Sequence, residues 1–241
     1  MNEPVDLVFD GPVAVVTLNN PPLNIFNLAM RDELIGAFTA IDDVTEVRAA
    51  VLRSEGRHFS AGADLSEFGS ASSIFEGRRI RWDRDPWGLL WDLRVPIVAA
   101  ITGTALGSGL EMSLLCDLRV AAPDAVLGLP ETKLGMLPAA GGTQSLTRAV
   151  GPAAALPHVA LADPVTGVEA ARRGLVHEVA DDPDGRARGL AHRLAGLDPV
   201  VVAAARRALR AAGDLPLEQG LDVEAGLAAA AQRAAQPPSI G

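Results

Sequence analysis

The chain has 241 residues and a formal net charge of -9, and hydrophobic residues make up 49% of it. This composition is typical of a globular protein with a substantial buried core and excludes a disordered chain. The acidic balance argues against a nucleic-acid partner, because such a partner requires a basic face.

The first predicted elements are two short β-rich runs. Residues 5–9 and 13–18 flank Asp10-Gly11, a dipeptide typical of tight hairpin turns. Asn27 then occupies the N-cap position of an amphipathic helix that extends to about Val44. These signals predict a β-hairpin followed by a helix.

Two further strands are predicted at residues 47–52 and 97–101. Each is followed by a loop that contains glycine and then by an apolar, helix-like segment. Such an alternation of strand, loop and helix predicts an α/β architecture with buried strands.

The amino-acid composition changes after Gly151. Alanine dominates and strand signals nearly vanish, apart from residues 175–179. Helices are predicted between prolines and glycines, at residues 152–162, 167–174, 186–196, 199–212 and 217–235. We therefore expect an α/β core at residues 1–195 and a helical carboxy-terminal region at residues 196–241.

Several kinds of site are excluded. The single cysteine, Cys116, rules out an internal disulfide and a CxxC motif, and the four histidines lack metal-ligand spacing, so we expect no metal site. The amino terminus lacks the basic start and apolar run of a signal peptide, and no stretch approaches the roughly 20 apolar residues of a membrane span. We therefore expect a cytoplasmic protein without a membrane partner.

The first candidate site segment is FSAGADL at residues 59–65, directly after a predicted strand. Its small residues let a ligand approach the backbone closely, and a loop that enters a helix presents free N–H groups. Taken alone, a tight strand-to-helix turn capped by Asp64 is the better explanation.

Two glutamates stand in apolar surroundings further along. Glu111 ends the segment PIVAAITGTALGSGLE at residues 96–111, in which a strand leads through a glycine-rich turn into a helix. Its carboxylate either reaches the surface or lies in a cleft with a raised pKa, and the residues alone favour neither. Glu131 ends LGLPE and precedes GMLPAAGGT at residues 135–143. On spacing alone, Glu131 is an exposed loop residue.

Together these segments resemble the crotonase family, the enoyl-CoA hydratase/isomerase group. The family patterns are approximately F-[SA]-A-G-x-D-[LI], P-[IV]-[IV]-A-A-[IV]-x-G-x-A-x-G-G-G-x-E and P-E-x-x-x-G-x-x-P-x-x-G-[GA]-T, and close matches to all three occur here in order. The resemblance covers roughly residues 5–215. It implies the crotonase spiral of ββα units, with a helical carboxy-terminal region that assembles trimers or hexamers of two trimers.

The resemblance also implies an activity, the reversible addition of water to trans-2-enoyl-CoA to give 3-hydroxyacyl-CoA. The amides of Ala63 and Ser108 would stabilise negative charge on the thioester oxygen. Glu111 would activate water, and Glu131 would protonate the α-carbon. Isomerases of the family commonly keep only the second carboxylate, so the presence of both favours a hydratase.

Coenzyme A enters as part of the acyl-CoA substrate, and no other cofactor is implied. The resemblance places its adenine against the backbone of Ala61, Asp64 and Leu65. Arg57 occupies a position where relatives often carry a basic residue near the phosphates, although an ordinary surface arginine is an equally good interpretation. Residues 75–93, which hold all three tryptophans, correspond to the acyl-pocket region, although such spacing is more often core packing.

The sequence departs from the family at several positions. Ser108 replaces the usual glycine at the oxyanion position, Ala139 stands where hydratases often have glycine, and Ser66 stands where lysine is common. The carboxy terminus is short relative to the family. Two alternatives to the hydratase therefore stay open: an isomerase or other crotonase reaction on a specialised acyl-CoA, and a non-catalytic acyl-CoA-binding protein.

Overall fold

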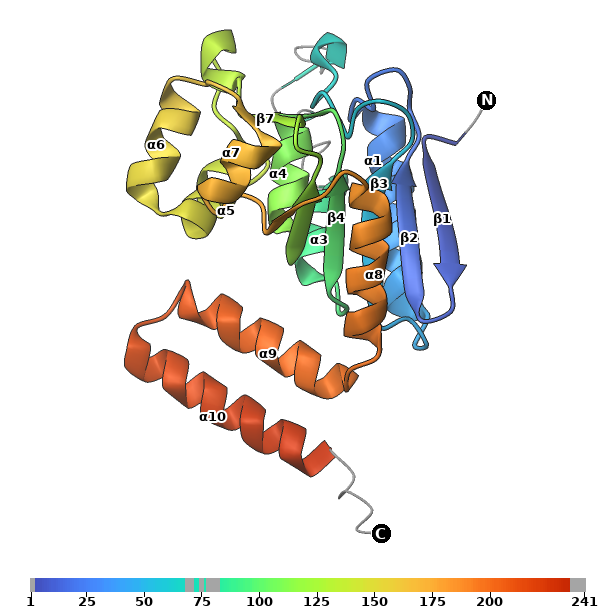
Figure 1. Cartoon of the computed structure of the whole chain (residues 1–241), viewed down its shortest axis with the longest axis vertical. Helices are drawn as coiled ribbons and strands as arrows, with labels where there is room; N and C mark the ends of the chain where they lie inside the picture. Colours follow the sequence, from blue (N-terminus) through green and yellow to red (C-terminus); the bar gives the residue numbers. More distant parts are fainter. Residues whose placement is uncertain (1–2, 68–71, 74–75, 77–82, 235–241) are drawn as a thin grey trace.

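A computed structural model of the chain describes residues 3–67, 72–73, 76 and 83–234 (Figure 1). The larger sheet has the strand order β1-β2-β3-β4-β6-β9, in which β1 is antiparallel to β2 and the other pairs are parallel. Its strands are β1 (Val5–Asp10), β2 (Val13–Leu18), β3 (Ala49–Ser54), β4 (Ile97–Ile101), β6 (Leu118–Ala121) and β9 (Glu178–Val179).

A second, smaller sheet stands beside the carboxyl ends of β3 and β4. It has the order β5-β7-β8, with β5 at Thr104–Leu106, β7 at Val126–Gly128 and β8 at Val165–Thr166. Because β5 follows β4 after two residues, the chain passes directly from the larger sheet into the smaller one. The segments that resemble the family motifs lie at this junction.

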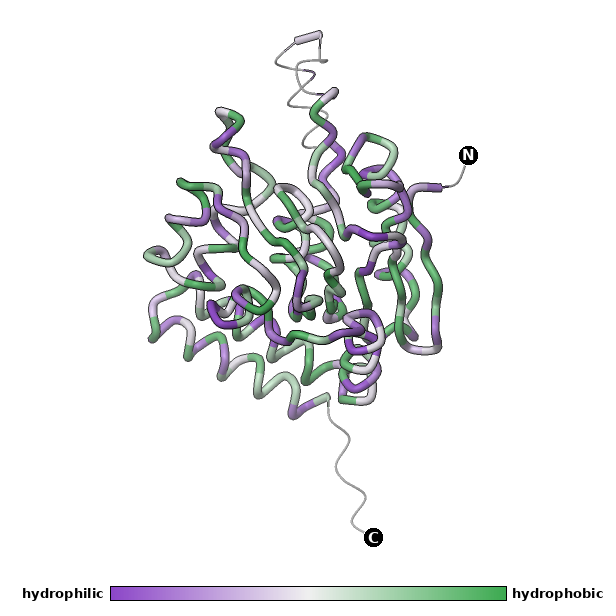
Figure 2. Tube along the Cα trace, turned by 45° about the horizontal axis from the view of Figure 1, so that its top comes forward, coloured by the Kyte–Doolittle hydropathy of each residue, from purple (hydrophilic) through white to green (hydrophobic). Residues whose placement is uncertain are grey.

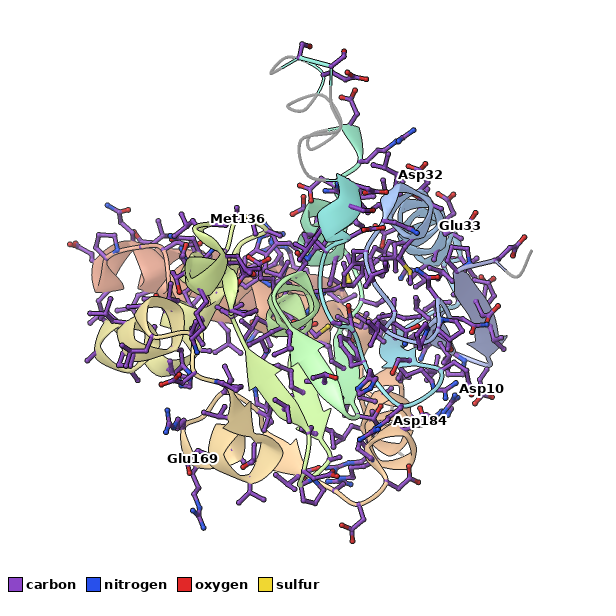
Figure 3. All side chains as sticks on the ribbon, turned by 90° about the horizontal axis from the view of Figure 1, so that it is seen from above. Asp10, Asp32, Glu33, Met136, Glu169 and Asp184 are labelled. Atoms are coloured by element: carbon purple, nitrogen blue, oxygen red, sulfur yellow. The ribbon has the colours of Figure 1, made fainter. Side chains whose placement is uncertain are left out.

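Helices cover both faces of the larger sheet. Along β2, Ala14, Val16 and Leu18 belong to the core beneath α1 (Leu28–Asp43), whereas Val13 and Val15 pack with α8 (Pro183–Ala195). Successive strand residues point to opposite faces, so strands buried on both sides are apolar throughout. Figure 2 shows this hydrophobic character along the central strands, and Figure 3 places Asp32 and Glu33 of α1 and Asp184 of α8 on opposite sides of the sheet.

Of the remaining helices, α3 (Pro86–Asp92) packs against α1, and the others lie around the small sheet and below the large one (Figure 1). These others are α4 (Ser108–Leu115), α5 (Gly142–Val150), α6 (Pro152–Ala160), α7 (Gly167–Arg172), α9 (Pro199–Ala212) and α10 (Leu217–Ala234), with the short 3-10 turns η1 (Leu65–Glu67) and η2 (Glu131–Leu134). Neither α9 nor α10 contains a buried residue. The Arg206 guanidinium on α9 pairs with Asp117 at 2.8 Å and so joins α9 to the core.

The structure confirms the α/β class and the hairpin at Asp10-Gly11, and it corrects several predicted boundaries. The strand predicted at 47–52 is β3, two residues later, and the strand predicted at 175–179 shortens to β9. The helix predicted at 186–196 begins earlier, at Pro183, because Asp182 caps it by accepting a hydrogen bond from the Gly185 amide. The strands β5, β6, β7 and β8 were not predicted, because each has only two to four residues.

Arg119 on β6 is a buried cation that holds the core together. Its side chain is hidden from solvent and donates to the carbonyls of Leu175 at 2.7 Å, Cys116 at 2.8 Å and Leu114 at 3.2 Å. Burial is the main reason why the pKa of Arg119 is lowered from its ordinary value. The carbonyls of Leu114 and Cys116 lie at the end of α4, and that of Leu175 lies in the segment before β9. Arg119 therefore connects the helix that carries the candidate site to the sheet.

Replacing Arg119 with methionine should lower the free energy of unfolding by about 2–4 kcal/mol, because several buried carbonyls lose their donor. Urea denaturation followed by circular dichroism measures this change. Arg207→Met on the exposed face of α9 is the control, and we expect a change within about 0.5 kcal/mol there. Equal stabilities of the two variants would contradict a structural role for Arg119.

Candidate active site

In the loop after β3, the run from Phe59 to Asp64 has one free backbone amide among the described residues. The amides of Phe59 and Ser60 donate to carbonyls of the segment at the start of β5, and those of Ala61 and Asp64 donate to the segment before α1. The Gly62 amide donates to Ser60 Oγ at 3.1 Å. In the described part of the chain, the Ala63 amide is the one in this run that donates to no acceptor. It is therefore available to a ligand.

A second free amide lies beside the first. Ser108 is the first residue of α4, so its N–H has no acceptor within the helix. Gly62, with φ +102°, packs against this point: a Cβ there would lie 2.9 Å from the Leu106 carbonyl oxygen and 3.6 Å from the Ser108 nitrogen. The positive φ and the close approach both require glycine. The structure thus brings the Ala63 and Ser108 segments together.

Glu111 lies in the first turn of α4, and its side chain is buried, with 1% of its surface exposed. Its Oε1 accepts hydrogen bonds from the Ala140 amide at 2.9 Å and the Gly142 amide at 2.8 Å. These donors stand at the amino terminus of α5, where unpaired amides stabilise negative charge. The carboxylate is consequently held in one orientation, facing the interior rather than solvent.

Glu131 opens η2 and is half-buried next to the glycine turn before α4. Its Oε1 lies 2.9 Å from the position that a Cβ on Gly107 would occupy, and its Oε2 is buried without a hydrogen-bond partner in the described part of the chain. Burial, and to a smaller extent the charge of Glu111, raise the pKa of Glu131 from 4.5 to about 7. A carboxyl group with this pKa can both donate and accept a proton near neutral pH.

Gly107 is the residue that joins these groups. It precedes the Ser108 amide in the chain, contacts Glu131, and adopts φ 53° and ψ -127°, which strongly favour glycine. Two free N–H donors and two carboxyl groups therefore converge on one place. This arrangement can stabilise an oxyanion while protons are moved beside it.

The residues predicted to contact coenzyme A flank the Ala63 amide. Ala61 and Asp64 are partly exposed, and Leu65 is 57% exposed at the start of η1. Hydrogen bonds from the hydroxyl and the amide of Ser66 lower the pKa of Asp64. Arg57 is exposed, and no hydrogen bond or ion pair of the described residues engages its guanidinium. Its contact with a phosphate stays a prediction.

Two of the three tryptophans have structural contacts: Trp87 lies in the core, and Trp91 contacts α9. The buried ring of Trp87 packs against Phe26, with ring centroids 5.3 Å apart, and its Nε1 donates to the Ser108 carbonyl at 3.4 Å. Trp91 stacks under the Arg210 guanidinium at 4.2 Å. The predicted acyl-pocket region at residues 75–93 also includes Phe75 and Trp82, which lie outside the described residues.

Sequence reasoning missed the amides of Ala140 and Gly142 as partners of Glu111. The signal that could have found them is the Gly141-Gly142 pair before α5, because a Cβ on Gly142 would lie 2.8 Å from Glu111 Oε1. Among the described residues, no three histidine, cysteine or acidic side chains form a group that could hold a metal ion. No helix in this part of the chain is long and apolar enough to cross a membrane.

A comparison with protein families identifies the group to which these features belong. A family profile described as enoyl-CoA hydratase/isomerase matches residues 9–237. The chain belongs to this family. The two motif glutamates and the two free amides thus stand in an enoyl-CoA hydratase/isomerase fold, and the family assignment made from three short motifs is confirmed.

Curated relatives and solved structures agree with this assignment. A probable enoyl-CoA hydratase of Bacillus subtilis is 38% identical over 208 residues, covering 83% of this chain and 79% of the relative. The short-chain-enoyl-CoA hydratase of Clostridium acetobutylicum is 34% identical over 227 residues, covering 89% and 84%. A crystal structure of a Geobacillus kaustophilus enoyl-CoA hydratase subunit superimposes with a TM-score of 0.86 at 34% identity, covering 93% of this chain and 88% of that one.

Proposed function

We propose that the protein is an enoyl-CoA hydratase, which adds water reversibly to trans-2-enoyl-CoA to give 3-hydroxyacyl-CoA. The observation that carries this proposal is the convergence of the Ala63 and Ser108 amides with the carboxyl groups of Glu111 and Glu131. Curated relatives named as enoyl-CoA hydratases support the reaction class. A hydratase of this kind is a lyase whose acyl-CoA substrate carries coenzyme A, and the mechanism needs no further cofactor.

The reaction follows from the arrangement of these groups. The thioester oxygen accepts hydrogen bonds from the Ala63 and Ser108 amides, which stabilise the enolate that forms when the β-carbon is attacked. Glu111 takes a proton from water as the water oxygen bonds to the β-carbon. Glu131, protonated at the start, gives its proton to the α-carbon as the enolate collapses. In dehydration each carboxyl group performs the reverse transfer.

One observation favours a second candidate, a double-bond isomerase. Glu111 Oε1 is already engaged by two amides and the side chain is almost fully buried, whereas Glu131 is only half-buried and has the raised pKa. A single carboxylate at Glu131 would suffice to take a proton from the α-carbon of a 3-enoyl-CoA and return it to the γ-carbon. The oxyanion hole would serve both reactions equally.

Glu111→Gln separates the two candidates. Hydration of short- and medium-chain trans-2-enoyl-CoA, followed as loss of the conjugated thioester absorbance, should fall about 10²-fold in this variant because water loses its base. Isomerisation of 3-enoyl-CoA, followed as a gain of the same absorbance, should stay within about threefold of wild type. A wild type that binds acyl-CoA but turns over neither substrate would contradict both enzymes and support a binding protein.

Assembly and location are further parts of the proposal. The helices α9 and α10 expose large apolar side chains, among them Leu209 at 76% and Leu217 at 80%, which supports a homotrimer, or a hexamer of two trimers, assembled through this region. We place the boundary of the core at residue 195, since α8 ends at Ala195 and α9 starts at Pro199. A cytoplasmic location and an acyl-CoA partner, without nucleic acid or membrane, complete the proposal.

A further inference from the structure

The direction of the Ala63 amide is set by a neighbouring segment. Residues 23–26 run beside residues 60–64, and the Phe26 amide donates to the Gly62 carbonyl at 2.9 Å. The Gly62 carbonyl and the Ala63 N–H belong to one planar trans peptide, so they point in opposite directions. Because the carbonyl faces Phe26, the N–H must face away from it. The placement of residues 23–26 therefore determines where the oxyanion donor points.

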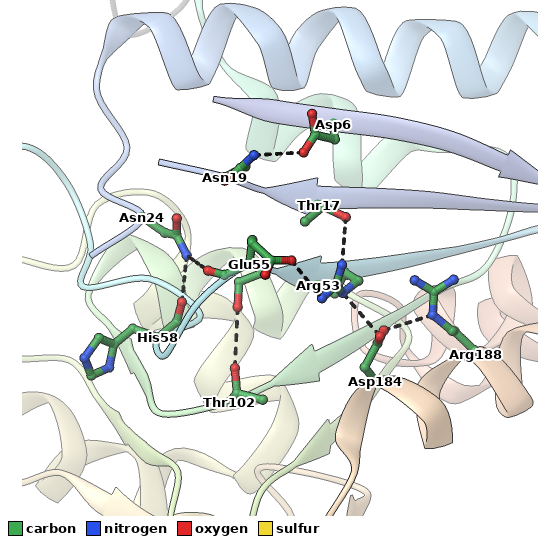
Figure 4. A network of polar contacts seen from close by, with 11 residues as sticks. Asp6, Thr17, Asn19, Asn24, Arg53, Glu55, His58, Thr102, Asp184 and Arg188 are labelled. Carbon is green, nitrogen blue, oxygen red and sulfur yellow. Dashed lines mark hydrogen bonds and ion pairs between the residues drawn. The ribbon is translucent and has the colours of Figure 1, made fainter. Parts of the chain in front are cut away.

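Asn24 anchors this segment. It is completely buried and adopts φ 48°, a left-handed conformation that asparagine tolerates better than most residues. Its Nδ2 donates to the carbonyls of His58 at 2.7 Å and Glu55 at 3.0 Å, as Figure 4 shows, and its Oδ1 accepts from the Asn20 amide at 2.8 Å. The side chain thus ties the segment before α1 to the loop that leads into the free amide.

Ser60, in the loop after β3, forms a second connection between this loop and the segment before α1. It is also completely buried, and its Oγ donates to the Asn24 carbonyl at 2.7 Å while accepting from the Gly62 amide at 3.1 Å. The backbone of α4 packs directly on it, since a Cβ on Gly109 would lie 2.8 Å from Ser60 Cβ. Ser60 is therefore in contact with both segments that supply an oxyanion donor.

We propose that Asn24 and Ser60 are positioning residues of the oxyanion hole, which hold the Ala63 amide at the thioester oxygen without touching the substrate. This inference rests on the proposed function, because it concerns the same site. The buried polar side chains of Asn24 and Ser60 both form hydrogen bonds with backbone groups. A network in which every buried polar group has a partner holds one geometry. Loss of either side chain should therefore misdirect the N–H more than it weakens acyl-CoA binding.

The test compares wild type with Asn24→Gly and Ser60→Ala. Glycine keeps the left-handed backbone and removes only the side-chain bonds. With trans-2-enoyl-CoA, kcat should fall roughly 10–100-fold in Asn24→Gly and about tenfold in Ser60→Ala, while KM changes less than about threefold. Asn19→Ala is the matched control, because among the described residues the Asn19 side chain bonds Asp6 alone, and its loss should leave kcat unchanged.

A spectroscopic measurement separates positioning from stability. Bound 4-dimethylaminocinnamoyl-CoA absorbs at longer wavelength when hydrogen bonds polarise its carbonyl oxygen, so both variants should show a smaller red shift than wild type at saturating probe. Folded variants with the wild-type kcat and red shift would overturn the positioning roles alone. If Asn24→Gly does not fold, Ser60→Ala decides by the same criterion. A wild type that neither hydrates substrate nor shifts the probe would instead reject the proposed function.

Discussion

Replacing Glu131 with glutamine should lower kcat for hydration by roughly 10²–10⁴-fold, the range that general acid catalysis contributes. The amide keeps the volume of the carboxylic acid but cannot give a proton to the α-carbon. Steady-state loss of enoyl-thioester absorbance measures the effect. Glu46→Gln is the control, because Glu46 is an exposed glutamate between α1 and β3 and should retain wild-type turnover. Retention of even a tenth of the wild-type rate in Glu131→Gln would contradict the role of the proton donor.

The pH dependence of the wild type provides an independent check on the same residue. The pKa of Glu131 is raised to about 7, and hydration requires its protonated form. Hydration kcat/KM should therefore fall tenfold per pH unit above about pH 7, and dehydration kcat/KM should fall in parallel, because the equilibrium constant of hydration does not depend on pH. A limb near pH 7 in both directions would support the assignment, and a kcat/KM that does not fall above this pH would exclude it.

The raised pKa also has a cost in stability. Between pH 4.5 and about 7 the folded protein holds this proton more tightly than the unfolded chain. The stabilising contribution is thus fully present below pH 4.5 and lost as the pH rises through about 7. Because the side chain is only half-buried, Glu131→Gln should be more stable than wild type at pH 8 by on the order of 1–2 kcal/mol, and this gain should vanish at pH 4. The variant that loses activity should gain stability.

The sequence predicted the elements whose signals are local. The hairpin at Asp10-Gly11, the helix capped by Asn27 and the strand at 97–101 each depend on neighbouring residues, and the structure contains all three. The strands β5, β7 and β8 were not predicted, because they have no periodic sequence pattern of their own. They form by pairing with distant segments of the chain. Their placement beside α4 is what creates the site.

The candidate site likewise combines features that the local sequence predicts with features that only the fold shows. Family motifs identified Glu111 and Glu131 in the sequence, yet only the fold shows that Glu111 is held by amides 29 and 31 residues away. Likewise, no local pattern separates Ala63 from its neighbours as the free donor. That distinction depends on which carbonyls the surrounding amides reach, and those carbonyls come from two separate parts of the chain. The catalytic roles of these residues stay predictions.

Gly107→Ala should lower hydration kcat/KM by about 10³-fold, because it disturbs two groups of the proposed mechanism at once, the Glu131 carboxyl group and the Ser108 amide. A Cβ at this position would lie 2.9 Å from Glu131 Oε1, so the carboxyl group must move away from the α-carbon. The backbone, at φ 53° and ψ -127°, would also relax towards angles that alanine accepts and turn the adjacent Ser108 amide. Loss of one oxyanion donor alone is worth roughly 10²–10³ in kcat.

Gly11→Ala in the β1–β2 turn separates this effect from backbone strain. Gly11 has φ +57°, close to that of Gly107, but a Cβ there would meet nothing within 4 Å. Both variants should lose about 1–2 kcal/mol of stability from the strained conformation, measured by urea denaturation. Only Gly107→Ala should lose activity and the red shift of the bound chromophoric thioester. If Gly11→Ala lost as much activity, or Gly107→Ala kept it, the contact between the glycine turn and Glu131 would have no catalytic importance.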